Sequence, residues 1–314
     1  MKTLKLLFGF TLVAALFTSC ISDDDFSNHN NNNISLDQLL NKYELWYVDI
    51  DETIGYRQVP FLQMAFTVSF QNGRLYANNN LVGFGEQGNG LGIPIGQYDA
   101  YGVILDTYHE IDGYDTFDVY QINTNTIELY NPYLDTSYCL RGYHRSNFDY
   151  DMVFYDNILY FLQEYEAWEK TYTSQAGQIN EFDNENYLQF LSHNNDTEFR
   201  SSQDYGINNP NNIYWDYTGV YNVWDVPNNM YLKELVLNYD GFGNEHFELY
   251  VINDGLIELY HNASGTTYEF SGRGYIEFIR NAEGKQTNKP KMRKFKNTKK
   301  DNPRENTRNL QTTK

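Results

Sequence analysis

The chain contains one stretch of sequence twice, and this repeat limits the folds open to it more than any other feature. The segment "LLNKYELW" at 39–46 aligns with "FLQEYEAW" at 161–168, with identity at four of eight positions. The segment "FDVYQINTNTIELY" at 117–130 aligns with "FELYVINDGLIELY" at 247–260, with identity at eight of 14 positions. Matches in the same order at both ends of a unit predict two homologous domains in tandem. The offset between copies grows from 122 to 130, which predicts a net insertion of eight residues in the second copy.

Each copy has the pattern of an antiparallel β-sheet. Apolar and polar side chains alternate in "LWYVDID" at 45–51, as expected for a strand with one buried face. The pairs Asn72-Gly73 and Asp254-Gly255 stand between strand-like runs and predict hairpins. Aromatic residues make up 17% of the chain and include 29 tyrosines, which suit a half-buried pleated surface. We therefore predict that both domains are mainly β.

A short helix is predicted ahead of the first strand, because Ser35 begins a capping-box pattern. A helix that leads into a strand bearing Trp46 or Trp168 resembles the small lipocalin-like domains that are common in Bacteroidota lipoproteins. In those domains a tryptophan near the start of the first strand plugs the floor of the barrel. The chain has Glu44 and Glu166 where that family usually has glycine, two residues before each tryptophan. The resemblance implies a mainly β fold of two tandem homologous antiparallel β-barrel (lipocalin-like) domains, each preceded by a short helix.

The N-terminal segment has the features of a secretory signal. Lys2 and Lys5 precede an apolar run from Leu6 to Phe17, which is too short to span a bilayer as a stable helix. The run ends in "FTSC", which resembles the lipobox of bacterial lipoproteins. The resemblance implies that Cys20 becomes the lipidated N-terminus, with acyl chains such as palmitate anchoring the protein in the outer membrane. With Cys20 lipidated, Cys139 is the only other cysteine, so we expect no intramolecular disulfide.

An acidic cluster follows the lipidation site. Ser22, Asp23, Asp24 and Asp25 resemble the signal that exports Bacteroidota lipoproteins to the cell surface. The resemblance implies an outer-membrane lipoprotein that is exposed on the cell surface. The asparagine-rich residues that come next are too polar to pack and are predicted to form a tether.

The C-terminal segment is basic, whereas the rest of the mature chain is acidic. Residues 281–314 carry a net charge of +8, and residues 21–280 carry −29. The segment has too few apolar residues to fold alone, and we predict a disordered tail. It could be simply solvated or could contact anionic lipopolysaccharide, nucleic acid or the acidic domains. Since no aromatic residues are interleaved for base stacking, we expect no specific nucleic-acid binding.

These features predict five segments along the chain. They are a lipoprotein signal peptide at 1–19, an acidic and asparagine-rich tether at 20–34, β-domain 1 at 35–150, β-domain 2 at 151–280 and a disordered basic tail at 281–314.

One motif raises the possibility of catalysis. Asp49-x-Asp51-x-Thr53 has the spacing of the nucleophile motif of haloacid-dehalogenase-type phosphatases. That chemistry requires a parallel strand buried on both faces, but this strand alternates, and the second copy lacks the acidic pair. We therefore expect Tyr47, Asp49 and Asp51 to lie on the solvent-facing side of a strand.

Other catalytic signals are weak or missing. Glu128 and Glu258 occupy equivalent positions and could suggest glycoside hydrolysis, but they belong to different domains and are predicted to be exposed. The six histidines share no metal-ligand spacing, and no nucleotide-binding or hydrolase motif is found. We predict no catalytic residues, no metal site and no cofactor.

An aromatic stretch at 208–229 is the candidate ligand site. It places several rings among asparagine, proline and aspartate residues: Tyr214, Trp215, Tyr217, Tyr221 and Trp224. Such a combination suits the binding of a sugar or of a protein partner. The alternative is that Trp215 and Trp224 pack in the core of the second domain.

The sequence therefore predicts a non-enzymatic surface lipoprotein that acts as a binding or assembly module. Its expected partners are the outer membrane, through the lipid anchor, and another envelope protein or a glycan. The alternative is an extracellular hydrolase that acts on a phosphate ester or polysaccharide. A third possibility, transport of a small apolar ligand in a barrel lumen, is opposed by the bulky aromatic residues expected inside.

Overall fold

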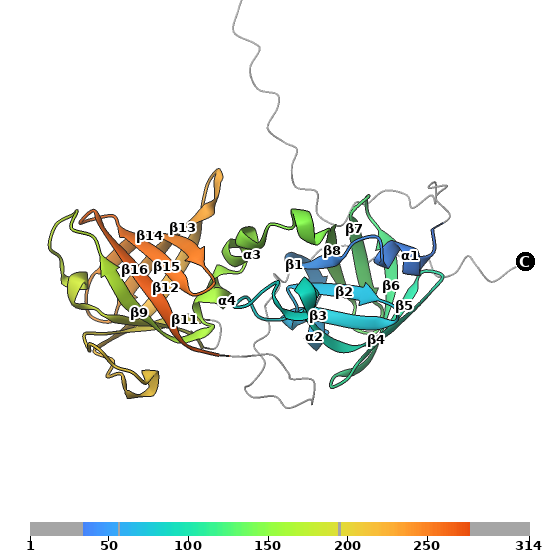
Figure 1. Ribbon diagram of the computed structural model, residues 1–314, viewed down its shortest axis with the longest axis horizontal. Coiled ribbons are helices and arrows are strands. Elements are labelled where there is room, and N and C mark those ends of the chain that lie inside the picture. Colours follow the sequence, from blue (N-terminus) through green and yellow to red (C-terminus); the bar gives the residue numbers. More distant parts are fainter. Residues whose placement is uncertain (1–33, 56, 194–195, 277–314) are drawn as a thin grey trace, which may run out of the picture.

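The chain folds into two closed β-barrels that follow one another along the sequence. The computed structural model describes residues 34–55, 57–193 and 196–276. In each barrel eight antiparallel strands are joined in sequence order, and the last strand pairs with the first. Figure 1 shows the first barrel in blue to green and the second in yellow-green to red. This confirms the prediction of two tandem antiparallel β-barrels of lipocalin-like form, each preceded by a short helix.

The strands of the first barrel are β1 (Leu45–Gly55), β2 (Thr67–Gln71), β3 (Arg74–Asn78), β4 (Ile93–Tyr101), β5 (Ile104–His109), β6 (Gly113–Gln121), β7 (Thr126–Asn131) and β8 (Thr136–Tyr143). Those of the second are β9 (Tyr165–Thr173), β10 (Tyr187–His193), β11 (Asp196–Ser202), β12 (Tyr217–Val226), β13 (Asn229–Tyr239), β14 (Asn244–Asn253), β15 (Leu256–His261) and β16 (Thr266–Tyr275). The α-helices are α1 (Leu36–Leu40), α2 (Pro60–Met64), α3 (Tyr150–Asp156) and α4 (Ile158–Leu162). The described residues also form four 3-10 turns: η1 (Gln87–Gly90), η2 (Arg145–Asn147), η3 (Glu181–Asn184) and η4 (Pro210–Asn212).

Local signals place the first elements as the sequence predicts. At the start of α1, the Gln38 backbone N–H donates to Ser35 Oγ, and the Ser35 N–H donates to Gln38 Oε1, which completes the capping box. Between β2 and β3, Asn72 and Gly73 both have positive φ, at 51° and 77°. A two-residue turn of this kind matches the twist of the flanking strands and fixes their register.

Each barrel is closed at one end over its own tryptophan. The indole N–H of Trp46 donates to the carbonyl of Leu40, and that of Trp168 donates to the carbonyl of Leu162, both at 2.8 Å and both across six residues. Both tryptophans have no accessible surface. The same helix end therefore holds the same ring in the two copies, which is the structural counterpart of the sequence repeat.

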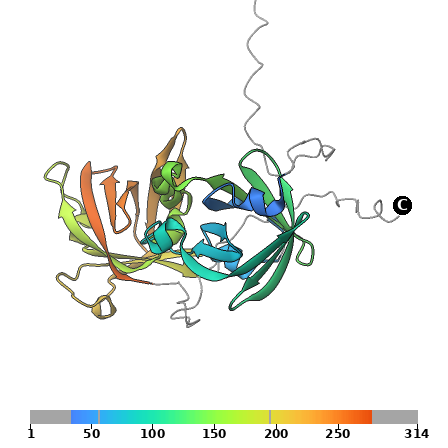
Figure 2. The ribbon, with the colours of Figure 1, turned by 45° about the vertical axis from the view of Figure 1, so that its right-hand side comes forward.

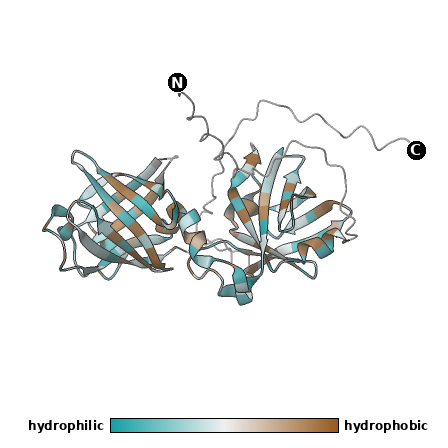
Figure 3. Ribbon diagram, turned by 90° about the horizontal axis from the view of Figure 1, so that it is seen from above, coloured by the Kyte–Doolittle hydropathy of each residue, from teal (hydrophilic) through white to brown (hydrophobic). Residues whose placement is uncertain are grey.

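The interior of each barrel is filled by large side chains. Figure 3 shows apolar and polar residues alternating along the strands, so that every second residue faces the core. Besides the two tryptophans, the fully buried aromatic side chains in the two barrels include Tyr138, Tyr221, Tyr268, Phe70, Phe117, Phe182 and Phe190. Such side chains fill a barrel of eight strands.

Helices α3 and α4 lie between the two barrels, as both Figure 1 and Figure 2 show. One apolar cluster runs from the core of the second barrel through these helices to Leu45, Tyr47 and Phe66 of the first barrel. Tyr47 is consequently only 6% exposed, and Asn157 donates to its hydroxyl at 3.3 Å. The expectation that Tyr47 faces solvent is wrong, because the joint between the barrels covers that part of β1.

A buried carboxylate connects the barrels at this joint. Glu164 has no accessible surface and precedes β9. Its carboxylate oxygens accept the backbone N–H of Leu81 at 3.0 and 3.1 Å and the N–H of Val82 at 2.9 Å, both from the β3–β4 loop of the first barrel. The neighbouring Gly83 N–H donates to Asp254 of the second barrel at 3.2 Å. The β3–β4 loop thus attaches the first barrel to the second.

Candidate functional site

The five aromatic residues of the candidate ligand site lie in different environments. Tyr214 and Trp224 are exposed, with 70% and 59% of their surface accessible. Trp215 and Tyr217 are half-buried, and Tyr221 is fully buried. Since side chains alternate along β12, Tyr221 points into the barrel and Trp224 points out of it. The structure therefore does not bring the five side chains together, and Trp215 alone among them lines the pocket formed by Glu166, Gln189, Arg200 and the β11–β12 loop.

This pocket has a volume of about 450 Å³ and lies against the second barrel. Its lining residues come from the start of β9, from β10 and β11, and from the β11–β12 loop: Glu166, Gln189, Arg200, Pro210, Asn211, Ile213 and Trp215. Only Trp215 was predicted from the sequence. Pro210, Asn211 and Ile213 fall within the same 208–229 stretch, whereas Glu166, Gln189 and Arg200 are distant along the chain and are brought there by the closed sheet.

The strands aim two polar side chains at the pocket. Gln189 and Arg200 are cross-strand partners in β10 and β11, and so are their neighbours Phe190 and Phe199. Both phenylalanines are buried in the barrel core, so Gln189 and Arg200 face outward. The Gln189 amide donates to the backbone carbonyl of Glu166 at 2.8 Å, which fixes this wall of the pocket.

The β11–β12 loop forms the opposite wall and is held by its own hydrogen bonds. The Tyr214 N–H donates to Asp204 at 2.8 Å, and the Ile207 N–H donates to the Tyr187 hydroxyl at 2.8 Å. Ile213 and Trp215 pack with Tyr187 in a small apolar cluster. The wall is thus formed without a ligand, which is typical of binding sites.

The pocket holds two unpaired charges of opposite sign. Within the described part of the chain, neither the Glu166 carboxylate nor the Arg200 guanidinium has a hydrogen-bond or ion-pair partner. By contrast, Arg141, Arg145 and Arg273 each pair with a carboxylate. Since Glu166 and Arg200 both line the pocket and neither charge is paired, the two residues can both bind a polar ligand.

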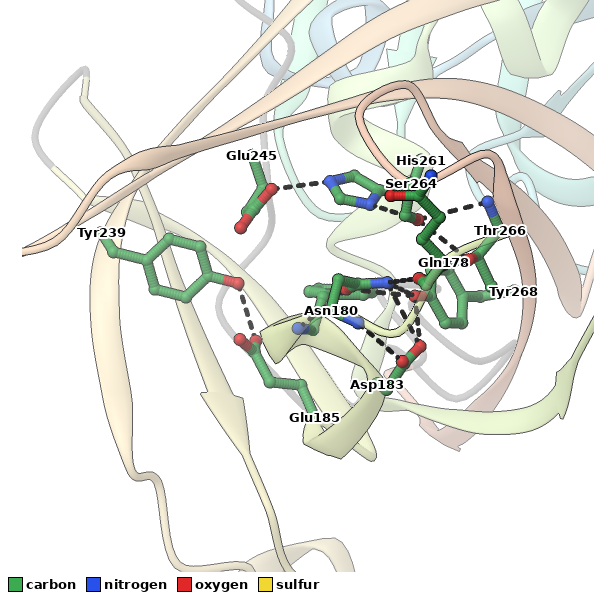
Figure 4. Close-up of polar contacts among 11 residues, drawn as sticks. Gln178, Asn180, Asp183, Glu185, Tyr239, Glu245, His261, Ser264, Thr266 and Tyr268 are labelled. Carbon is green, nitrogen blue, oxygen red and sulfur yellow. Dashed lines mark hydrogen bonds and ion pairs between the residues drawn. The ribbon is translucent and has the colours of Figure 1, made fainter.

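A second polar cluster closes one end of the second barrel, where the segment that carries η3 crosses it. Figure 4 shows Asn180 and Asp183 of this segment beside Tyr268, and Glu185 beside Tyr239. The Tyr268 hydroxyl donates to Asp183 at 2.7 Å, and the Tyr239 hydroxyl donates to Glu185 at 2.7 Å. These bonds fasten the segment to the barrel wall.

His261 belongs to the same cluster. Its Nε2 lies 2.6 Å from Glu245, and its Nδ1 lies 2.8 Å from the Ser264 hydroxyl. Phe182 is 1% exposed and contacts the His261 ring. The first copy has Asn131 and Asp115 at the corresponding positions, joined at 3.1 Å. Because Phe182 covers the cluster, we interpret it as a structural closure of the barrel.

Burial perturbs the charges of this closure. Glu185 is 6% exposed, and desolvation raises its pKa to about 7. The nearby charge of Glu245 adds to this rise, whereas the hydrogen bond from Tyr239 and the positive charge of Lys170 oppose it. Desolvation lowers the pKa of Lys170 to about 8. Glu185 is therefore largely protonated at slightly acidic pH.

Glu185→Gln is expected to remove a pH dependence of stability. The pKa of Glu185 rises from 4.5 to about 7 on folding, so the folded state binds this proton more tightly. The stabilisation is complete below pH 4.5 and is lost as the pH rises to about 7, by an amount on the order of 3 kcal/mol. We expect the wild type to lose unfolding free energy relative to Glu185→Gln between pH 5 and pH 8. Urea denaturation of both proteins at each pH measures this change. Glu181→Gln, on the exposed side of η3, is the matched control and should follow the wild type; equal pH profiles for all three proteins would contradict the prediction.

The acidic residues considered for catalysis do not form a common site. Asp49 is bonded to the Arg141 Nε at 3.0 Å, with 17% of its side chain accessible, and Asp51 is exposed. Glu128 is 3% exposed and accepts a hydrogen bond from the Ser137 hydroxyl, so the expectation that it is exposed is wrong. Glu258 is half-buried. Among the residues that the structure describes, no group of three or more His, Cys, Asp or Glu side chains could hold a metal ion.

The state of Cys139 differs from the one that the sequence predicts. It is 1% exposed and is disulfide-bonded, so the expectation that it lacks a disulfide partner is wrong. Cys20 is the only other cysteine in the sequence. One sulfur atom cannot form both a disulfide and a lipid thioether, so these two states of Cys20 are alternatives.

Several predicted features lie outside the described residues. They are the signal peptide, Cys20, the export signal of Ser22, Asp23, Asp24 and Asp25, and the basic tail from residue 281. In the ranges that the structure does describe, no helix is long and apolar enough to cross a membrane.

Comparisons with known proteins give no family. No protein-family model matches the chain, and no curated protein matches its sequence. One match among solved structures is an octameric penicillin-binding protein homologue from Pyrococcus abyssi, with 7% sequence identity and a TM-score of 0.20. The match covers 55% of this chain and 37% of that protein. A likeness at this TM-score carries no argument about fold or function.

Proposed function

We propose that this protein is a non-enzymatic binding or assembly module and that its ligand enters the pocket beside Trp215. The observation that carries the proposal is that Glu166 and Arg200 line this pocket without partners, next to an aromatic side chain. Buried aromatic and arginine side chains are the residues that contribute most to binding energy at interfaces. The ligand belongs to another envelope protein or to a glycan.

We also propose that the module is a lipoprotein of the outer membrane, exposed on the cell surface. The support comes from the lipobox-like "FTSC" that ends at Cys20 and from the acidic residues that follow it. The two barrels would then be carried outside the membrane on the tether. An acyl anchor keeps such a module at the surface where its partner is found.

Lipidation of Cys20 predicts an acylated N-terminus. We expect intact mass spectrometry of the protein from its native membrane to show a chain that starts at Cys20 and carries acyl groups. Cys20→Ser should release the protein from the membrane, and Cys139→Ser, the matched control, should not. A chain that carries no acyl groups would contradict the lipid anchor.

The binding proposal predicts that one tryptophan matters and another does not. Full-length Trp215→Ala and Trp224→Ala proteins would be cross-linked on intact cells and purified in detergent. We expect the partner recovered with the wild type to be reduced about tenfold or more with Trp215→Ala, which corresponds to roughly 1.4 kcal/mol. Trp224→Ala removes a more exposed ring outside the pocket and should leave recovery unchanged. Equal recovery with both variants would contradict the proposed site.

A further inference from the structure

The first copy of the repeat shows what the glutamate before the tryptophan can bind. Glu44 lies two residues before Trp46, as Glu166 lies two residues before Trp168. The Glu44 carboxylate accepts hydrogen bonds from Nε and Nη2 of Arg145 at 2.9 and 2.7 Å, and from the Arg145 backbone N–H at 3.0 Å. These hydrogen bonds lower the pKa of Glu44. Glu44 is therefore the acceptor of a guanidinium group.

Arg145 is also held by the β3–β4 loop of the first barrel. Its Nη1 donates to the carbonyl of Asn89. A Cβ at Gly90 would lie 3.0 Å from Arg145 Cδ, so the loop passes close to the aliphatic part of the side chain. The guanidinium of the first copy thus sits between a glutamate and the β3–β4 loop.

The second copy has the same two walls, and the pocket lies between them. Glu166 forms one wall, and Asn211 belongs to the β11–β12 loop, which corresponds to the β3–β4 loop. The residue of the second copy that is equivalent to Arg145, 130 positions later, is Tyr275. Its ring centroid lies 6.1 Å from that of Tyr165, and it carries no cationic group. The pocket therefore corresponds to the place that the Arg145 guanidinium occupies in the first copy.

Arg200 adds a positive charge to the pocket that the first copy lacks at the equivalent position. Leu188 pairs with Trp168 as Val68 pairs with Trp46, so the β10–β11 pair Gln189↔Arg200 corresponds to the β2–β3 pair Ser69↔Tyr76. A guanidinium stands in the second copy where the first has a tyrosine. A ligand that brings only a cation to Glu166 would meet this positive charge, whereas a ligand that also carries a carboxylate would pair with it.

We infer that the pocket binds an arginine residue that has a free carboxylate, either as the amino acid or as the C-terminal residue of a polypeptide. The ligand guanidinium binds Glu166 as Arg145 binds Glu44, and the ligand carboxylate binds Arg200. The Trp215 ring contacts the aliphatic part of the ligand. This inference rests on the proposed function and specifies the chemistry of its ligand.

The test is calorimetric titration of the full chain with three related compounds. L-Arginine carries both charged groups, L-citrulline replaces the guanidinium by a neutral urea, and agmatine lacks the carboxylate. We expect L-arginine to bind about tenfold or more tightly than either of the other two, because each loses one charge-assisted pair.

Two variants assign the two pairs. Glu166→Gln should abolish the preference for arginine over citrulline and keep the preference over agmatine. Arg200→Gln should abolish the preference over agmatine and keep the preference over citrulline. Both residues are outside the barrel cores, and unchanged thermal unfolding would show that the variants fold.

Peptides distinguish the two sources of the ligand. A peptide that ends in arginine is compared with the same peptide as its C-terminal amide and with free arginine; tighter binding of the acid peptide assigns a protein C-terminus, and tighter binding of free arginine assigns the amino acid. Equal affinity for arginine and citrulline, or no binding up to about 10 mM, overturns the inference. If Trp215→Ala loses the envelope partner while arginine does not bind, the proposed function stands and this ligand chemistry is wrong.

Discussion

Trp168→Ala is expected to lower the free energy of unfolding of the second barrel by about 3–5 kcal/mol. Trp168 has no accessible surface, and its indole N–H is bonded to the carbonyl of Leu162 at 2.8 Å. Its ring also contacts Phe161 and Tyr165 edge to face. The substitution therefore removes a large apolar contact, leaves a cavity and frees a buried carbonyl. Urea denaturation followed by circular dichroism measures the loss.

The repeat supplies the control for this prediction. Trp46→Ala should cause a loss of similar size in the first barrel, because Trp46 makes the same bond to Leu40. Trp224→Ala should change stability by no more than about 0.5 kcal/mol, since its side chain is exposed. A small effect of Trp168→Ala, near that of Trp224→Ala, would contradict the role assigned to this ring.

Glu164→Ala is expected to loosen the joint between the barrels. The substitution leaves the backbone N–H groups of Leu81 and Val82 without the carboxylate that accepts them. Each buried donor left unpaired costs about 1–3 kcal/mol, so the joint loses roughly 2–6 kcal/mol. Glu164→Gln keeps one acceptor oxygen and should lose less. We expect the barrels of Glu164→Ala to unfold in two separate steps in denaturant.

Hydrogen exchange locates the effect of Glu164→Ala. Exchange of the Leu81 and Val82 amides should accelerate strongly, whereas the indole of Trp46, inside the first barrel, should remain protected. Glu166→Ala removes a carboxylate two residues away that is not bonded at the joint and serves as the matched control. Unchanged protection of Leu81 and Val82 in Glu164→Ala would contradict the joint described here.

The barrels could be predicted from the sequence because the information is local. Alternation along each strand marks the buried face, and the turn at Asn72-Gly73 fixes a hairpin. The repeat then requires that both copies adopt one fold, with Trp46 and Trp168 in one environment. These signals depend on neighbouring residues and on spacing, which a sequence displays directly.

The joint could not be predicted, because it depends on which outward face another part of the chain covers. Tyr47 lies on the polar side of its strand by alternation, but α3 and α4 cover it. Glu164 has the composition of a surface residue and is fully buried by the β3–β4 loop. No local pattern indicates either contact.

The sequence predicts the candidate ligand site only in part. Composition groups Tyr221 with Trp224, although residues three apart on a strand point to opposite faces. No local pattern indicates Arg200 and Glu166, because the closed sheet brings them together from separate strands. Comparison of the two copies in the structure points to Glu166, because Glu44 pairs with Arg145 in the first copy and the residue equivalent to Arg145 in the second is Tyr275.

The indole N–H signals of the four tryptophans test the account most directly. In a nitrogen-15 spectrum of the full chain transferred to D₂O, two signals should exchange slowly, those of Trp46 and Trp168, assigned by their phenylalanine variants. Addition of L-arginine should shift the Trp215 signal and leave that of Trp224 unchanged. One slowly exchanging indole instead of two would contradict the pair of equivalent barrels, and an unchanged Trp215 signal would contradict the binding of arginine at the pocket.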